Sequence, residues 1–487
     1  MNLEDSVSGG LTVVLDVGKT LAKLSLWDRA GRLVERRSRP NARIEACSGT
    51  GGGAGAYAAL DAEGVEAWLA GVLADFARMG PVETIIPVAH GAAVAVLRDG
   101  RLACPPMDYE QSLPSADRAA YEAGRDAFAR TGSPRLPDGL NLGAQLHRLE
   151  TLYPGLLGEG ATILPWAQYW AWRLSGVAAC EVTSLGCHSD LWRPLEAAPS
   201  SLAIARGWAE RLAPLRRADE VLGVITPAWV QRTGLAAHVR VLCGLHDSNA
   251  ALLAARGFPE IAGQEATVLS TGTWFVAMRS PAAGERIDIS RLDEARDCLV
   301  NVDAEGRPTP SARFMGGREI ELLTGLDTRR VDIPPDQRAL LAAAPAAIAS
   351  GALVLPTLTP GVGPFPQGRG RWIDAPADES SRRAVVCLYA ALVADAALDL
   401  IGARERILIE GRFAEAEVLV RALAALRPHT AIYVSHADID LSYGALRLLD
   451  PGLPPASSLV RALPLETDLA AYRRAWRSQV ERCEAAA

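Results

Sequence analysis

Lysine is nearly absent from this chain of 487 residues. Of its 50 basic residues only Lys19 and Lys23 are lysines, and all the others are arginines. Two lysines placed at random would rarely lie four positions apart, and rarely inside a glycine turn. A compact ammonium beside phosphate oxygens acts differently from a planar guanidinium. The pair therefore indicates a chemical requirement for lysine at this turn.

Other absences exclude whole classes of protein. No apolar run reaches the roughly 18 residues of a membrane span. Residues 1–10 are polar and acidic and lack the basic and apolar regions of a signal peptide. The eight cysteines include no Cys-x-x-Cys pair, which is typical of reduced, buried thiols. A net charge of -7 argues against nucleic-acid binding. We expect a cytoplasmic protein with neither nucleic acid nor membrane as a partner.

The abundant residues describe a globular α/β protein. Hydrophobic residues make up 49% and charged residues 22%, as in an ordinary folded chain. The length predicts two large lobes or three smaller ones. Short apolar runs that predict strands alternate with amphipathic runs that predict helices, among them residues 66–79 and 381–401. This alternation indicates an α/β fold.

Two predicted hairpins carry polar, glycine-containing tips. The first joins strands at 11–15 and 22–27 through Val17-Gly18-Lys19-Thr20. The second joins strands at 266–269 and 274–278 through Ser270-Thr271-Gly272-Thr273, about half a chain later. Exposed N–H groups at glycine tips form anion sites, and neither tip is a P-loop. The weak repeat predicts two similar lobes, each offering one phosphate-binding turn; the alternative is a pair of ordinary tight turns.

Two aspartates stand at strand ends where chemistry is expected. Asp16 precedes the first tip, where it could hold Mg²⁺ through water; the alternative is a turn-capping role. Asp247 follows a strand at 239–243 and opens a helix of small residues, a position where α/β proteins bind ligands. A carboxylate there could accept the proton of an attacking hydroxyl, and a helix N-cap is a compatible alternative.

In combination these segments resemble the FGGY carbohydrate kinases. The match runs through Asp16-Val-Gly-Lys-Thr with Lys23, then Glu181-Val-Thr-Ser-Leu-Gly-Cys-His-Ser-Asp, Gly244-Leu-His-Asp-Ser-Asn-Ala and Ser270-Thr-Gly-Thr. The resemblance implies a two-lobed ribonuclease-H-like (actin-like ATPase) α/β fold with an interlobe cleft. It also implies an N-terminal sugar-binding lobe over residues 1–240 and a C-terminal nucleotide-binding lobe over residues 241–487.

The same resemblance implies a role for each site residue. Asp247 would be the catalytic base, and Asp16 would hold Mg²⁺ through water. ATP would be bound by Gly18, Lys19, Thr20, Lys23, Ser270, Thr271, Gly272, Thr273, Gly316, Gly411 and Gly444. The sugar would be bound by His90, Gly91, Asp108, Gln145, His188, His246 and Asp247. At the adenine end the family has two glycines, whereas this chain has Glu410-Gly411-Arg412, which leaves the purine contacts open.

The implied activity is transfer of the γ-phosphate of ATP, with Mg²⁺, to a hydroxyl of a small sugar. The motifs around Asp108 and residues 185–190 favour a ketose or deoxyketose of the L-rhamnulose or L-fuculose type. Xylulose and polyols stay open as substrates. An ATPase or acetate-kinase-like enzyme and a non-catalytic nucleotide-binding regulator are the alternatives of other kinds. The oligomeric state is open, with a homodimer among the options.

Overall fold

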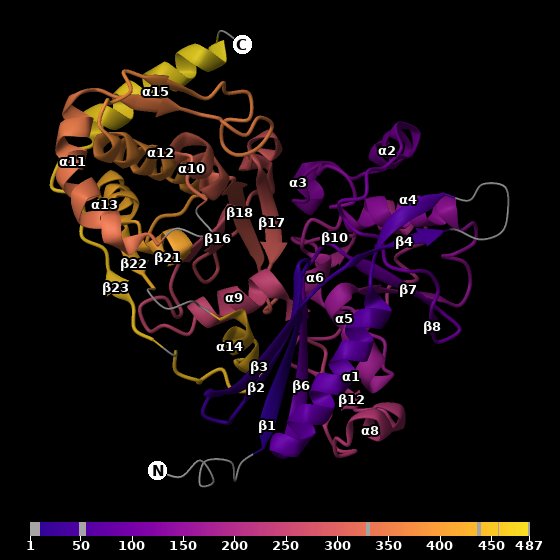
Figure 1. Ribbon diagram of the computed structural model, residues 1–487. Coiled ribbons are helices and arrows are strands. Elements are labelled where there is room, and N and C mark those ends of the chain that lie inside the picture. The colour runs from indigo at the N-terminus through magenta and orange to yellow at the C-terminus, as the bar shows by residue number, and fades with distance from the viewer. Residues whose placement is uncertain (1–9, 48–54, 328–331, 436–439, 456, 486–487) are drawn as a thin grey trace, which may run out of the picture. The chain divides into compact units, whose positions relative to one another are not determined.

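The computed structural model describes residues 10–47, 55–327, 332–435, 440–455 and 457–485 (Figure 1). By internal contacts the chain divides into two compact units, each built from several stretches. The first unit comprises Met1–Gly257, Val300–Pro308 and Asp440–Pro454, and the second comprises Phe258–Leu299, Thr309–Ile439 and Pro455–Ala487. No helix of the described stretches combines the length and apolarity that crossing a bilayer needs.

A mixed sheet organises the first unit, in the order β12-β13-β6-β1-β2-β3. Its strands are β1 (Leu11–Val17), β2 (Leu21–Trp27), β3 (Leu33–Pro40), β6 (Val82–Ala89), β12 (Val221–Val224) and β13 (Arg240–Leu242), and β14 (Leu245–His246) also pairs with β6. Along β1 and β6 nearly every residue is buried, as expected of central strands covered on both faces.

Alternate residues of β1 pack into two different cores. Val13 and Leu15 belong to the cluster formed with helices α1 (Ala62–Met79) and α5 (Trp166–Ser175). Val14 belongs to the cluster formed with α9 (Asp247–Ala255) and α14 (Leu441–Leu446). The two-residue period of a strand makes this division. It fixes α9, and with it Asp247, on one face of the sheet.

Smaller elements complete the first unit. Antiparallel pairs are formed by β4 (Arg43–Cys47) with β5 (Ala56–Leu60), by β7 (Val94–Arg98) with β8 (Arg101–Leu102) and β9 (Ala161–Pro165), and by β10 (Trp192–Arg193) with β11 (Ala198–Pro199). The remaining helices are α2 (Ser115–Glu122), α3 (Phe128–Thr131), α4 (Leu142–Leu152), α6 (Val182–Leu185), α7 (Ser201–Ala205) and α8 (Pro227–Thr233).

The second unit is built on a sheet in the order β18-β16-β15-β21-β22-β23, which β17 (Cys298–Val302) extends at the β18 end. The other strands are β15 (Ala266–Thr271), β16 (Phe275–Ser280), β18 (Pro308–Phe314), β21 (Arg406–Gly411), β22 (Ala431–Val434) and β23 (Val460–Arg461). Its core also contains α10 (Gly316–Thr324), α11 (Gln337–Ala349), α12 (Glu379–Leu400), α13 (Glu417–Leu426) and α15 (Ala470–Ala485), and a short pair joins β19 (Leu353–Leu355) to β20 (Arg371–Ile373).

The internal repeat predicted from the two tips is confirmed in the strand pairing. In each unit the first hairpin strand pairs with its partner in antiparallel fashion and with a later strand in parallel. Asp16 lies opposite Lys23 and beside Val88, while Ser270 lies opposite Val276 and beside Glu410. The two tips therefore occupy corresponding positions in two similarly connected sheets.

Helices α1 and α12 each begin a few residues before the predicted start, because the side chain of an aspartate caps each helix at that point. The helix predicted at 66–79 begins at Ala62, where the Asp61 side chain accepts a hydrogen bond from the Gly64 N–H. The helix predicted at 381–401 begins at Glu379, capped by Asp378. Strands β13 and β14 pair with β6, so residues 241–257 stay with the first compact unit, and the division of family domains at residue 240 remains a prediction.

Candidate active site

Asp247 is the first residue of α9, where its two carboxylate oxygens have different surroundings. Oδ1 accepts hydrogen bonds from the Ser248 backbone N–H and from the Ser248 hydroxyl at 3.1 Å. Oδ1 also lies 3.1 Å from His246 Nε2. Within the described residues Oδ2 has no such partner, and the side chain is 27% exposed. The carboxylate is thus held through one oxygen and available through the other.

His246 lies between two groups that can carry negative charge. Its Nε2 atom is 3.1 Å from the Asp247 carboxylate and 3.5 Å from Cys187 Sγ. Burial favours the neutral imidazole, but Cys187 and Asp247 outweigh burial and raise the pKa of His246 well above its ordinary value. Burial likewise opposes ionisation of Cys187, yet His188 and His246 lower the pKa of this thiol to about 6. A Cβ at Gly91 would lie 2.8 Å from Cys187 Sγ, so glycine at position 91 makes room for this pair.

Two buried polar side chains of the first unit, His90 and Gln145, have atoms without partners among the described residues. Neither ring nitrogen of His90 has a hydrogen bond within the described part of the chain, and the same is true of Gln145 Oε1. Burial lowers the pKa of His90 to about 4, against the opposing charge of Asp247. Gln145 Nε2 donates to the carbonyls of Ala92 and Gly139. Unmatched buried polar atoms are costly, and a polyhydroxyl ligand could satisfy them.

The Lys19 ammonium lies against the completely buried carboxylate of Asp108 and 4.6 Å from the centre of the Tyr109 ring. It is also 3.6 Å from Glu110 Oε2. Arg43, on β4, approaches the second carboxylate oxygen of Asp108 to 3.4 Å. The lysine assigned to phosphates and the acid assigned to sugar thus form one cluster.

Asp16 is buried at the end of β1 with Lys23 Nζ 3.5 Å from its Oδ2 atom. Burial, opposed by Lys23 and assisted by Asp247, raises the pKa of Asp16 to about 7. The Lys23 charge only partly offsets the cost of burying the Asp16 carboxylate, and a bound cation would offset the rest. The described residues contain no cluster of three or more metal-ligating side chains. The donor set therefore fits a Mg²⁺ held by this carboxylate through water and by phosphate oxygens.

The first glycine tip is stabilised by a residue that sequence analysis missed. Asn41 donates its side-chain amide to the Gly18 carbonyl at 2.7 Å and its backbone N–H to the Thr20 carbonyl at 2.8 Å. The Gly18 N–H donates to Leu21 O at 3.0 Å. The tip is a closed turn whose shape is set by a strand neighbour rather than by its own sequence.

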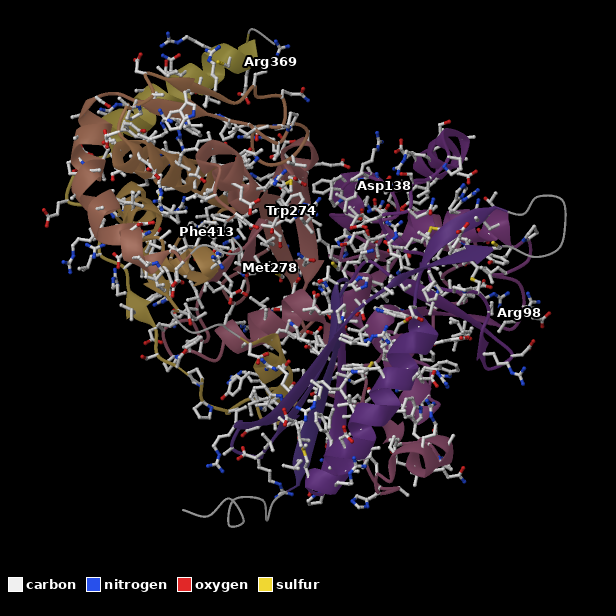
Figure 2. All side chains as sticks on the ribbon, viewed as in Figure 1. Arg98, Asp138, Trp274, Met278, Arg369 and Phe413 are labelled. Carbon is white, nitrogen blue, oxygen red and sulfur yellow. The ribbon has the colours of Figure 1, made fainter. Side chains whose placement is uncertain are left out.

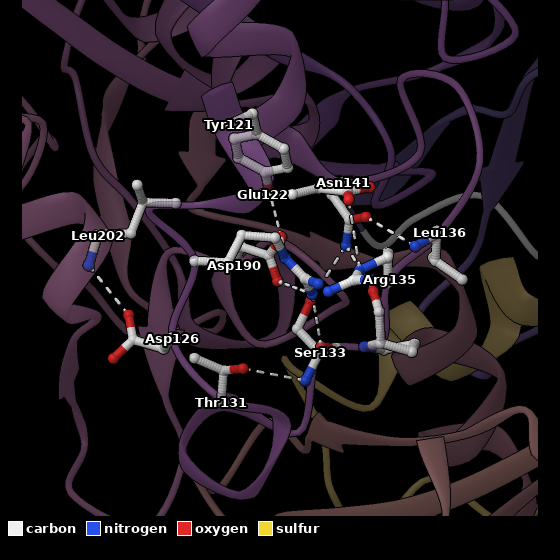
Figure 3. A network of polar contacts seen from close by, with 12 residues as sticks. Tyr121, Glu122, Asp126, Thr131, Ser133, Arg135, Leu136, Asn141, Asp190 and Leu202 are labelled. Carbon is white, nitrogen blue, oxygen red and sulfur yellow. Dashed lines mark hydrogen bonds and ion pairs between the residues drawn. The ribbon is translucent and has the colours of Figure 1, made fainter. Parts of the chain in front are cut away.

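His188 lies in a strained loop after α6 and is bound to the backbone. Its φ angle is 36°, and its Nδ1 atom is 2.9 Å from the Leu140 carbonyl. Asp190 anchors the same loop, because its carboxylate accepts two hydrogen bonds from Arg125, at 2.7 and 2.9 Å, and one from the Tyr121 hydroxyl (Figure 3). Such a bidentate, buried ion pair fixes the loop that carries Cys187 and His188.

In the second unit the hydroxyls of the predicted phosphate turn already have protein partners. Ser270 donates to the Glu410 carboxylate. Thr271 donates to the Glu410 carbonyl and accepts the Phe413 N–H at 3.1 Å. The Gly272 N–H donates to the Trp274 carbonyl at 3.0 Å. The two hydroxyls thus fix the end of β15 to β21, and Thr273, which is exposed, follows them at the tip.

In the second unit, the Gly272 turn makes close backbone contacts with the start of α10 and with Gly411. A Cβ at Gly317 would lie 2.1 Å from the Gly272 carbonyl oxygen, so the start of α10 touches the turn. Gly411, at φ 79°, would place a Cβ 2.6 Å from Thr271 O. Gly444 belongs instead to the first unit, where a Cβ would lie 1.8 Å from Ala250 O on α9. The structure gives Gly444 a helix-packing role, whereas the start of α10 and Gly411 both adjoin the second turn.

A largely apolar pocket in the second unit adjoins these glycines, and sequence analysis did not identify it. Phe413, labelled in Figure 2, contributes to its wall just after Gly411. The pocket lies among helices α10 to α13, and its lining includes Ile320, Thr324, Ile333, Gln337, Leu340, Arg383, Phe413 and Ala416. Such a concave apolar surface suits a flat aromatic base. Its residues have the pattern of ordinary core positions, so no sequence signal distinguishes them.

Comparison with known proteins agrees with these features. The family model described as carbohydrate kinase FGGY, C-terminal domain, matches residues 263–456. A carbohydrate kinase from Novosphingobium aromaticivorans is 58% identical, with a TM-score of 0.92 over 98% of this chain and 100% of that one. The search of curated proteins found no match.

More distant structures share the fold. A ligand-bound xylulose kinase from Lactobacillus acidophilus is 14% identical, with a TM-score of 0.77 over 98% of both chains. Glycerol kinase from Plasmodium falciparum, with ADP, is 12% identical, with a TM-score of 0.77 over 98% of this chain and 99% of that one. The fold is the two-lobed actin-like ATPase fold predicted from sequence.

The fold and the family match together define an enzyme that transfers phosphate to a sugar. More particularly, the chain belongs to the FGGY carbohydrate kinases. Enzymes of this family use ATP and a sugar as substrates.

Proposed function

We propose that this kinase phosphorylates a ketose or deoxyketose of the L-rhamnulose or L-fuculose type, with Asp247 as the base. The observation that carries the proposal is a set of buried polar atoms without partners in the unit that contains Asp247. His90 offers two ring nitrogens and Gln145 offers Oε1, all without partners among the described residues. A sugar carries several hydroxyls that both donate and accept, so it can satisfy such atoms together.

Asp247 is suited to accept the hydroxyl proton. Its pKa is lowered because His246 outweighs the effect of burial, so it is ionised at neutral pH. Oδ2, which no donor among the described residues contacts, is the acceptor we assign. Removing the proton as the oxygen attacks phosphorus makes the hydroxyl a better nucleophile.

The nucleotide side of the proposal rests on two groups of residues. In the second unit, the turn at Gly272 and Thr273 adjoins the start of α10 and the apolar pocket beside Phe413. We assign the phosphates to the turn and the purine to the pocket. In the first unit, we assign phosphate contacts to Gly18, Thr20, Lys19 and Lys23. Mg²⁺ would neutralise phosphate charge, with Asp16 holding it through water.

Asp108 has a composite role in this proposal. Its carboxylate is fixed by Lys19 and Arg43, so it would orient those cations as well as accept a sugar hydroxyl. His246 faces Asp247 and Cys187, while His188 is bound to the Leu140 carbonyl. We therefore assign direct sugar contacts first to His90, Gln145 and Asp108.

A panel of substrates tests the proposal. ATP consumption is measured with L-rhamnulose, L-fuculose, D-xylulose, D-gluconate, glycerol and no sugar. The proposal expects a kcat/KM for one of the deoxyketoses at least tenfold above that for D-xylulose and glycerol. A preference for xylulose or a polyol would overturn the substrate assignment while leaving the kinase class. ATP binding without turnover on any sugar would support a non-catalytic regulator.

A further inference from the structure

Asp247 Oδ1 accepts two hydrogen bonds from Ser248, whereas Oδ2 accepts none from the described residues. His246 Nε2 also lies 3.1 Å from Oδ1, and 3.5 Å from Cys187 Sγ. A carboxylate oxygen has two lone pairs, so Oδ1 has little capacity left to accept a further proton. The choice between the two oxygens is therefore made by the protein before any ligand arrives.

The neighbour of His246 Nδ1 bears on whether Nε2 carries a proton. The Asn249 side-chain amide lies 3.4 Å from Nδ1, one helical turn further along α9. If its N–H donates to Nδ1, the neutral ring must carry its proton on Nε2. If instead the ring is charged, both nitrogens carry protons. In either state Nε2 carries a proton, and this nitrogen lies 3.1 Å from Asp247 Oδ1 and 3.5 Å from Cys187 Sγ.

The backbone of His246 is held just as firmly. Its N–H donates to the Thr183 hydroxyl at 3.0 Å. That hydroxyl donates to Glu181, a fully buried carboxylate that also accepts the N–H groups of Thr183 and Ser184. This chain of contacts ties the backbone of the residue before the base to α6.

We propose that His246 is a positioning residue, which donates Nε2–H to Asp247 Oδ1 and thereby reserves Oδ2 for the substrate proton. The proposal rests on the role of Asp247 as the base. It removes His246 from the set of sugar ligands assigned by sequence. Its effect falls on the chemical step, because an unfixed carboxylate would spend less time in the reactive geometry.

Two substitutions of His246 separate this role from a structural one. In His246→Gln the side-chain amide reaches the position of Nε2 and keeps a donor to Oδ1. In His246→Asn the amide reaches only the position of Nδ1, and the donor is lost. We expect kcat to fall at least 30-fold in H246N and less than fivefold in H246Q, with the KM for sugar changed less than threefold in both. The control is His147→Gln, at a buried histidine of α4, which should leave kcat and KM at wild-type values.

Three outcomes would overturn the inference. They are equal loss of kcat in both His246 variants, a rise in KM with kcat unchanged, or an unfolding transition lowered enough to explain the loss. A second readout does not depend on turnover. In ¹⁵N-histidine NMR spectra, the resonance that disappears in H246N should show a protonated Nε2. An unprotonated Nε2 would refute the inference even if the chain phosphorylated no sugar tested, and such inactivity alone would count only against the proposed function.

Discussion

The Lys19 ammonium contacts the Oδ1 atom of Asp108, a carboxylate with no exposed surface. Lys19 stands at the tip of the first glycine turn, 89 positions before its partner. This ion pair links the turn predicted to bind phosphate with the acid predicted to bind sugar, inside a single compact unit. Under the proposed roles, Lys19 would respond to both substrates.

A double-mutant cycle measures that link. We expect Lys19→Met and Asp108→Asn to be coupled by about 1–3 kcal/mol in the free energy of unfolding, because removing one partner leaves the other charge buried. The exposed pair Arg217 and Asp219, 2.7 Å apart, is the matched control and should show much weaker coupling, because solvent screens it. Equal coupling in the two cycles would contradict a special role for Lys19 and Asp108.

Asp247→Asn removes the proposed base without changing the shape of the side chain. We expect kcat to fall by about 10²–10⁴-fold, the usual contribution of general-base catalysis. ATP affinity, measured by calorimetry, should change less than threefold. The control is Asp378→Asn at the exposed start of α12, which makes the same substitution at a helix N-terminus far along the chain from the site. Near-normal turnover in D247N would exclude Asp247 as the base.

Gly411 tests the packing of β21 against the second turn. Its backbone, at φ 79° and ψ -168°, is in a region that only glycine adopts readily, and a Cβ would lie 2.6 Å from Thr271 O. We expect Gly411→Ala to destabilise the protein by about 1–3 kcal/mol or more and to raise the KM for ATP. Gly402→Ala is the control, since φ is 70° there and the nearest atom is at 3.8 Å. Equal effects in thermal unfolding would show that the close contact does not matter.

Glu181 should make stability depend on pH. Burial raises its pKa from 4.5 to about 7, against hydrogen bonds from Thr183 and Ser184. A carboxyl whose pKa is raised on folding stabilises the folded state below the unfolded pKa, and this contribution is lost as pH rises through the folded pKa. Between pH 4.5 and 7, the free energy of unfolding of the wild type, measured in urea, should therefore fall by up to roughly 3 kcal/mol relative to that of Glu181→Gln. A difference that stays constant over this range would contradict the raised pKa.

Sequence analysis predicted what local pattern encodes. The hairpins, their polar tips and their duplication follow from alternation and glycine placement, and the pairing of β1 with β2 and β15 with β16 agrees. The sequence also pointed to His246, which directly precedes Asp247, as a site residue. It could not predict the contacts of the His246 ring, because these are made with Cys187 and Asn249.

The remainder of the site depends on tertiary contacts that leave no local signal. Arg43 and Asn41 come from the segment after the first hairpin and reach the site only because β3 and β4 fold beside it. The partners of Ser270 and Thr271 lie about 140 positions away, in Glu410. The Ser270 and Thr271 hydroxyls, which we predicted to bind phosphate, hydrogen-bond to Glu410 in this structure. The sequence of the tip alone does not show these partners.

The central proposal is that a sugar hydroxyl binds at Asp247 Oδ2, in the unit that also carries the Gly18–Thr20 turn. A crystal structure with a non-hydrolysable ATP analogue, Mg²⁺ and the preferred sugar tests it most directly. The account predicts a sugar hydroxyl within hydrogen-bond distance of Asp247 Oδ2 and phosphate contacts from the Gly18–Thr20 turn. A sugar bound away from Asp247, or phosphates that do not contact this turn, would contradict it.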